Sequence, residues 1–94
     1  MAVEVRRNDE RSRYEAVIEG AVVGIADYRR RGDVVAIPHT EVNPELRGQG
    51  VAAELVRAVL DDIRAQGALV DPQCSYVADF IRRQPAYADL RAGH

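Results

Sequence analysis

Up to Val42, the hydrophobic residues lie in short segments of the kind expected of β-strands, and hydrophobic and polar residues alternate in the first of them, Val3–Arg7. Gly20 lies where a hairpin turn is expected, and Gly32–Asp33 marks a second hairpin. Pro38 interrupts the last segment, and because proline has no N–H to donate, we expect a bulge or a locally unpaired edge there. The predicted strands are Val3–Arg7, Tyr14–Glu19, Val22–Arg31 and Val34–Val42.

The hydrophobic period then changes to that of a helix. Gly67 is placed to cap the C-terminus of this first helix, and a short apolar strand, Ala68–Val70, follows. A second helix is predicted over Cys74–Gln84 and ends at Pro85, after which the chain adds one more turn. The residues that recur at helical spacing in the first helix are Ala52, Leu55, Val56, Val59, Leu60 and Ile63. Further core positions are expected at Phe80, Tyr87 and Leu90.

This order of elements predicts an α+β (mixed α/β) fold. A four-stranded antiparallel meander is followed by helix, strand and helix, which gives a single twisted sheet with helices packed on it. The helix between the fourth and fifth strands should be a right-handed crossover that leaves those two strands parallel. With 94 residues, the chain is expected to be one domain over residues 1–94.

Composition excludes several classes of chemistry. All 13 basic residues are arginine, so no lysine nucleophile or Schiff base is available. The single cysteine excludes an intrachain disulfide and a cysteine-cluster metal site, and no metal is expected. Acidic and basic residues are interleaved at a net charge of −2, which argues against a nucleic-acid partner. No segment is apolar enough for a signal peptide or a membrane span, so we expect a cytoplasmic protein.

Two glycines stand at the start of the first helix, within Arg47–Ala52. The first N–H groups of a helix lack partners inside the helix, and its dipole favours negative charge there, so this turn suits a phosphate or pyrophosphate. A P-loop needs a lysine after its second glycine, and the chain has none. A dinucleotide-binding fingerprint needs a third glycine where Ala53 stands, and it belongs in a parallel βαβ unit.

The pattern Arg-x-x-Gly-x-Ala, after an antiparallel meander, resembles the pyrophosphate-binding motif of the GNAT superfamily of acetyl-CoA-dependent N-acetyltransferases. The chain resembles in particular a small one-domain subgroup with a Cys at the start of the last helix and a Pro-x-Tyr after it, from about Tyr14 to Leu90. The resemblance implies that acetyl-CoA is the co-substrate. It implies a pantetheine arm between the fourth strand, including Thr40 and Val42, and the fifth. It also implies a pyrophosphate held by Arg47, Gly48, Gln49, Gly50, Val51 and Ala52.

Acetyl transfer to an amine requires a neutral amine, a donor for the developing oxyanion and a proton for the departing thiolate. His39 and Glu41 are two apart on a strand and should share a face, so either can be the base; alternatively, His39 stabilises a bulge and Glu41 pairs with an arginine. Cys74 opens a helix, where the dipole favours a thiolate. It is expected to contact the coenzyme sulfur or acetyl group, to form an acetyl-cysteine intermediate, or simply to be a small buried residue.

The chain departs from the wider superfamily at the general acid. Many members carry a tyrosine about two turns into the last helix, but the corresponding residue here is Ile81, which cannot donate a proton. Tyr76 is the nearest substitute, and we expect it to pack instead, so the acid is unassigned. Arg82 and Arg83, or Arg29–Arg31, are candidates for the ribose 3′-phosphate of the coenzyme, and a solvated face is the alternative for each set.

The sequence therefore predicts an acetyl-CoA-binding N-acetyltransferase that moves an acetyl group to an unidentified amine on a protein, a peptide or a small molecule. The alternative is a non-catalytic acyl-CoA-binding, regulatory or interaction module with the same fold. The resemblance implies a shallow acceptor site, because the chain lacks the early helices of full-length relatives. A monomer or a weak homodimer is expected.

Overall fold

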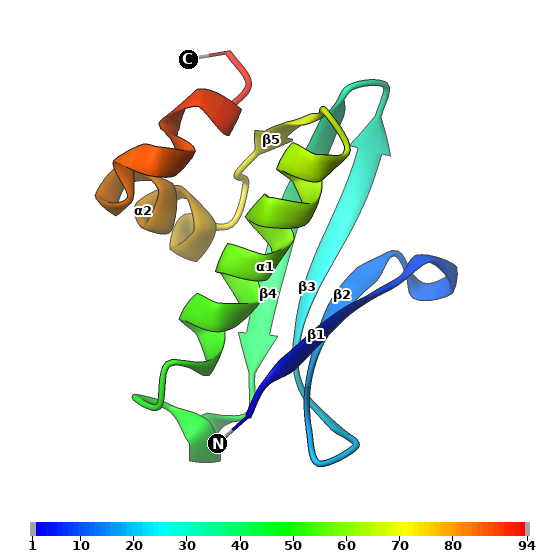
Figure 1. Cartoon of the computed structure of the whole chain (residues 1–94), viewed down its shortest axis with the longest axis vertical. Helices are drawn as coiled ribbons and strands as arrows, with labels where there is room; N and C mark the ends of the chain where they lie inside the picture. Colours follow the sequence, from blue (N-terminus) through cyan, green and yellow to red (C-terminus); the bar gives the residue numbers. More distant parts are fainter. Residues whose placement is uncertain (1, 94) are drawn as a thin grey trace.

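A computed structural model describes residues 2–93. One five-stranded sheet has the order β1-β2-β3-β4-β5, antiparallel except for the parallel pair β4–β5, and both α-helices lie on one face of it (Figure 1). This confirms the predicted fold class, and the strand boundaries differ from the predicted ones by one residue or none. The elements are β1 Glu4–Asn8, β2 Arg13–Ile18, β3 Ala21–Arg31, β4 Val34–Val42, α1 Val51–Ala65, β5 Leu69–Asp71 and α2 Ser75–Arg83.

Short 3₁₀ turns, Asp9–Arg11, Pro44–Leu46 and Pro85–Leu90, complete the chain. The last begins at the proline that was expected to end α2. At the C-terminus of α1, the N–H of Gly67 donates to Arg64 O and the N–H of Ala68 donates to Ile63 O. These two bonds form a Schellman motif and confirm the predicted glycine cap.

The sheet has a bulge at Pro38, as predicted. Asp27 pairs with His39 and Arg29 pairs with Ala36, so Ile37 and Pro38 together oppose one residue of β3. On the other side, the pairing of β4 with β5 runs from Val34 to Ala36 and stops there. Beyond Pro38, the second half of β4 has β3 on one side and no partner from β5 on the other.

The core lies between the sheet and the helices. The buried face of α1 is the one that helical periodicity predicted from Leu55 onward, with Leu55 and Leu60 fully buried; at its start Val51 is buried and the predicted Ala52 only partly so. The helix α2 adds Val77, Phe80 and Ile81, at the i, i+3, i+4 spacing of a single face. Phe80 and Leu90 are buried as expected, whereas Tyr87 is only partly buried, and its hydroxyl donates to Asp61 on α1.

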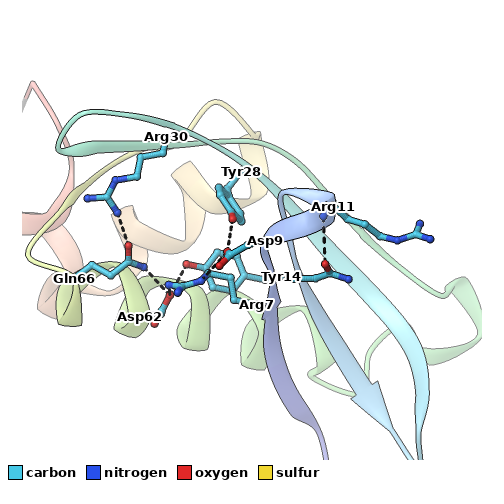
Figure 2. A network of polar contacts seen from close by, with 9 residues as sticks. Arg7, Asp9, Arg11, Tyr14, Tyr28, Arg30, Asp62 and Gln66 are labelled. Atoms are coloured by element: carbon cyan, nitrogen blue, oxygen red, sulfur yellow. Dashed lines mark hydrogen bonds and ion pairs between the residues drawn. The ribbon is translucent and has the colours of Figure 1, made fainter.

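A polar network ties the meander to the C-terminal half of α1 (Figure 2). Asp62 of α1 accepts hydrogen bonds from the Tyr14 hydroxyl at 2.6 Å, from Arg7 at 3.0 Å and from Gln66 at 2.8 Å. Tyr14 is 3% exposed, and its burial raises the pKa of its phenol above the ordinary range. The hydroxyl therefore stays protonated at every physiological pH and donates its hydrogen bond to Asp62. The network is an attachment between two layers that the sequence pattern does not reveal.

Glu15 is the one buried charged residue in the described part of the chain, at 2% exposure. Its partner across the strands is Ile25, on the face of the sheet away from α1. Its carboxylate accepts hydrogen bonds from Arg6 Nε at 2.8 Å, from Arg13 Nε at 2.8 Å and from the Asn8 side-chain amide at 3.3 Å. The hydrogen bonds from Arg6 and Arg13 hold the pKa of this carboxyl at about 2, below its ordinary value of 4.5.

Replacing Tyr14 by phenylalanine should lower the free energy of unfolding by about 1–2 kcal/mol, since a partly buried hydrogen bond to a charged group is lost. Urea unfolding followed by circular dichroism measures this change. Tyr76→Phe is the control: that ring is 41% exposed and its hydroxyl has no hydrogen bond within residues 2–93, so a change below about 0.5 kcal/mol is expected. Equal losses in the two variants would contradict a tethering role for Tyr14.

Glu15 should make the stability pH-dependent in acid. Because its folded-state pKa is lowered, its contribution is complete above pH 4.5 and is lost as the pH falls towards 2. Unfolding curves of the wild type and of Glu15→Gln, measured between pH 2 and pH 6, should therefore differ most at the upper end and converge at the lower end. Glu10→Gln, at an exposed position, should run parallel to the wild type throughout. A constant gap between wild type and Glu15→Gln would refute the assignment.

Candidate functional site

The turn from Arg47 to Gly50 joins β4 to α1, and its two glycines are needed for backbone conformation. Gly48 has φ +79° and Gly50 has φ +82°, in the left-handed region that other residues rarely adopt. A β-carbon placed on either residue would meet nothing within 4 Å. The glycines therefore allow the turn itself, and the space beside the backbone is open.

The N–H groups at the start of α1 are free. Gly50 is the N-cap and has no side chain to cap the helix, and the first helical bond runs from the N–H of Glu54 to Gly50 O. Within residues 2–93, the N–H groups of Val51, Ala52 and Ala53 have no acceptor. Together with the dipole of a 15-residue helix, these donors form an anion-binding arrangement.

A cavity of about 350 Å³ opens over this turn. Arg47 lines it, is exposed, and forms no ion pair within the described residues. Tyr76 of α2 also lines it. The predicted coenzyme residues Val42, Arg47, Gly48, Gly50, Val51 and Ala52 all line this cavity, and Gln49, which is exposed, does not.

Cys74 lies where β4 and β5 separate. It is the N-cap of α2, its N–H donates to Ile37 O at 2.9 Å, and its Sγ lies 3.3 Å from Thr40 Oγ1. Burial alone raises the pKa of the Cys74 thiol, but the Thr40 hydroxyl and backbone N–H groups at the start of α2 outweigh it. The pKa is therefore lowered from its ordinary value of 9.0. The structure thus brings together Thr40 and Cys74, two residues that the sequence placed in the site separately.

His39 and Glu41 lie on the other face of the sheet. His39 Nε2 is 3.8 Å from Glu41 Oε2, which confirms that the two side chains share a face. Their cross-strand partners are Asp27 and Ile25, whereas Thr40 pairs with the buried Ala26 beneath α1. Consecutive residues of β4 therefore point to opposite faces: Thr40 towards the helices, His39 and Glu41 towards the face that carries no α-helix.

Tyr76 does not pack in the core, and that prediction was wrong. Its side chain is 41% exposed and borders the cavity at the glycine turn. The reason is helical geometry: Val77, Phe80 and Ile81 form the buried face of α2, and position 76 falls outside it. Ile81 is 3% exposed. The position at which many GNAT proteins carry the tyrosine that acts as general acid therefore belongs to the core here.

The two arginine sets predicted for the 3′-phosphate differ in their surroundings. Arg82 and Arg83 are exposed and both pair with Asp79 on α2, with Arg83 Nε at 3.0 Å from the carboxylate. In the set at the end of β3, Arg30 donates to Gly32 O and to the side chain of Gln66. That set does not line the cavity over the glycine turn, and Arg82 lies next to Tyr76 in a neighbouring hollow.

Comparison with known families decides the assignment. Residues 13–90 match the sequence profile of the GCN5-related N-acetyl-transferase family. The chain belongs to this family. The match includes the glycine turn, Cys74 and the Pro-x-Tyr segment, so it covers the residues on which the GNAT resemblance rested.

Solved GNAT structures share the fold. A GCN5-like N-acetyltransferase candidate from Staphylococcus aureus, solved by NMR, superposes with a TM-score of 0.74 at 25% identity and covers 97% of this chain and 89% of that one. The ribosomal-protein-S18-alanine N-acetyltransferase of Escherichia coli gives a TM-score of 0.62 at 16% identity, covering 79% of this chain and 50% of that one. At such an identity the likeness concerns the fold alone.

Among sequence relatives, protein NATD1 of Bos taurus is 33% identical over 52 residues, which are 55% of this chain and 46% of that protein. This GNAT chain therefore matches less than half the length of that relative. No helix between residues 2 and 93 combines the length and apolar character needed to cross a membrane. Over the same residues, no group of three His, Cys, Asp or Glu side chains is arranged to hold a metal ion.

Replacing Thr40 by valine should raise the pKa of Cys74, because the hydroxyl that stabilises the thiolate is removed. The rate of alkylation by iodoacetamide, measured by intact mass between pH 6 and pH 10, reports the thiolate fraction. Its midpoint should move to higher pH in Thr40→Val and stay near the wild-type value in Thr40→Ser, which keeps a hydroxyl. An unchanged midpoint in the valine variant would show that Thr40 does not influence the thiol.

Proposed function

We propose that the protein is an acetyl-CoA-dependent N-acetyltransferase acting on an amine. The observation that carries the proposal is the anion-binding arrangement at the start of α1. N–H groups without an acceptor in residues 2–93, a helix dipole and Arg47, which forms no ion pair within those residues, meet in one cavity, at the residues that resemble the pyrophosphate motif of GNAT proteins. The Escherichia coli neighbour acetylates an alanine of a ribosomal protein, and here a protein or peptide amine or a small amine is proposed as acceptor.

The coenzyme would lie along the helix-bearing face. The N–H groups of Val51 and Ala52, with Arg47, would hold its pyrophosphate, and the pantetheine arm would run beside Thr40 and Val42 where β4 and β5 separate. The bound acetyl-CoA supplies an activated thioester. Cys74 would meet its reacting end, since its N–H fixes it to Ile37 O at the point of separation. Its thiol would contact the sulfur or acetyl group, or, as the thiolate, would attack the acetyl carbon so that the thioester C–S bond breaks and the coenzyme leaves as its thiolate.

The amine would approach from the opposite face. His39 and Glu41 lie there, exposed, on the strand segment that begins after Pro38. An alkyl ammonium with a pKa near ~10.4 is neutral in only about one molecule in a few thousand at pH 7, so a nearby base is needed. Either side chain can take the ammonium proton, directly or through water. The coenzyme and the amine would then meet beside the second half of β4, where β5 no longer pairs with it, each coming from a different face of the sheet.

One observation favours a second function, a non-catalytic acyl-CoA-binding or interaction module. Ile81 is buried in the core, so the position of the usual general acid cannot serve proton transfer. Both functions need the coenzyme site at the glycine turn. They differ in whether bound acetyl-CoA is consumed when an amine is added.

A negative charge at Ala52 tests the coenzyme site. Glutamate at this second helical position favours α1 through its dipole but repels a pyrophosphate, so Ala52→Glu should weaken acetyl-CoA binding by about tenfold or more. Ala52→Gln, of equal size and without charge, is the matched control. Gly50 is a poorer site for this test, because any substitution there strains the left-handed turn.

Isothermal titration measures the affinity of each variant, and release of free coenzyme thiol on addition of spermidine or an alanine-terminated peptide measures transfer. Binding that is weakened only by glutamate, with thiol released, supports the transferase. Equal affinity in the glutamate and glutamine variants would remove the turn as a coenzyme site. Binding without thiol release from any amine favours the module.

A further inference from the structure

A second hollow lies on the face of the sheet that carries no α-helix. It measures about 330 Å³, and its lining includes Ile25 and Glu41, which are opposite each other on β3 and β4. Val42, at the end of β4, lines both this hollow and the cavity at the glycine turn. A molecule bound here is therefore next to the proposed coenzyme site and in contact with Glu41, which can take a proton from it.

Most of the side chains that line this hollow are apolar. Val22 is 42% exposed, one of three large apolar side chains that residues 2–93 expose. It lies at a bulge: Ala16 pairs with Gly24 but Val17 pairs with Val22, so β3 has one extra residue here. The hollow thus offers apolar surface to the body of a ligand. The apolar members of the lining are Val22, Val23, Ile25, Val42 and Pro44.

The polar groups of the lining differ in how far they are already engaged. The side chain of Glu41 is 69% exposed, and its nearest charged neighbour is His39, at 3.8 Å. Arg13 Nε instead donates to the buried Glu15 at 2.8 Å, and the Arg13 side chain is 24% exposed. Asn43 Oδ1 already accepts a hydrogen bond from a backbone N–H. Among its lining residues the hollow therefore has one carboxylate for one ammonium group, and no second acid.

We propose that the acceptor is a primary amine with a single positive charge and an unbranched apolar chain, and that this hollow binds the chain. The ammonium group meets Glu41, and the chain runs along β3 from Ile25 to Val22. The inference rests on the proposed function, since it names the class of amine that the same site acetylates. A polyamine such as spermidine is then a poor acceptor, because a second ammonium group would lie among apolar side chains without a carboxylate.

The length of the hollow sets the length of the chain. Ile25 is directly opposite Glu41, and Val22 is three residues earlier on β3, which corresponds to about 10 Å. An extended chain of about eight atoms covers that distance. In 1,6-diaminohexane, the second nitrogen therefore comes next to Val22 when the first nitrogen is at Glu41.

The test compares hexylamine with 1,6-diaminohexane, which has the same carbon chain and a second charge. Release of free coenzyme thiol from acetyl-CoA measures transfer to each. For the wild type, kcat/KM should be about tenfold or more higher for hexylamine. Propylamine should fall below hexylamine by about three- to fourfold for each methylene that the hollow buries. Equal kcat/KM values for the monoamine and the diamine would overturn the inference and leave the transferase intact.

Val22→Glu supplies the missing second carboxylate. This variant should increase kcat/KM for 1,6-diaminohexane about fivefold, and such a gain cannot come from a damaged fold. Val22→Gln, of equal size and without charge, should weaken hexylamine as an acceptor and give no gain with the diamine. Glu45→Gln removes an exposed acid outside the hollow and should leave the ratio between the two amines unchanged. A Val22→Glu variant without the gain would contradict the position of the chain.

A binding measurement separates this inference from the proposed function. Hexylamine, titrated into the isotopically labelled wild type, should shift the amide NMR signals of Val22, Ile25 and Asn43 in a saturable way and leave those of α2 unchanged. Such shifts without thiol release from any amine would refute the transferase and retain the amine site. Neither shifts nor thiol release would refute both.

Discussion

A proline in the middle of β4, two residues beyond the end of its parallel pairing with β5, fixes the geometry of the whole site. Pro38 has no N–H, so β4 cannot continue its backbone hydrogen bonds through this residue. The pairing of β4 with β3 therefore contains a bulge at this position. The pairing with β5 ends two residues earlier, at Ala36. The carbonyl of Ile37 then accepts its hydrogen bond from Cys74, which brings the start of α2 to the point where the strands separate. Thr40 and Cys74 meet as a consequence.

The helix α1 has one secured end and one open end. Near its C-terminus, Asp61 bonds Tyr87, Asp62 bonds Tyr14 and Arg7, and Arg64 forms a bidentate pair with Asp89. At its N-terminus no side chain caps the helix. Strong attachment far from the turn allows the first turn to keep its N–H groups unpartnered without loosening the helix. In this 15-residue helix, the C-terminal end therefore carries the stabilising contacts and the N-terminal end keeps N–H groups available for a ligand.

The elements of the fold could be read from the sequence, because alternation and helical spacing are local signals. The bulge at Pro38 was also predictable, since the missing N–H is a property of one residue. The shared face of His39 and Glu41 follows from their spacing, but the face itself depends on the bulge and on where α1 crosses the sheet. The contact between Thr40 and Cys74 joins residues 34 apart and needs the tertiary structure.

The error at Tyr76 has a similar cause. Aromatic residues in a short amphipathic helix are usually core residues, and only the phase of the buried face, set by Val77, Phe80 and Ile81, shows that position 76 lies outside it. Asp62 likewise lies outside the apolar face of α1, and the helical spacing alone does not show that it accepts a hydrogen bond from the hydroxyl of the buried Tyr14. The hydrophobic pattern also does not predict the parallel bridge between Arg91 and Val70 of β5.

The alternation of side chains along the second half of β4 has a consequence for how the protein can change. Positions 39 and 41 face one side of the sheet and positions 40 and 42 the other, with only a strand between them. Substitutions at odd positions can alter what is recognised on one face without touching the lining of the other. A single strand thus carries two independently variable surfaces, so substitutions on the face of His39 and Glu41 leave the arrangement around Thr40 and Cys74 unchanged.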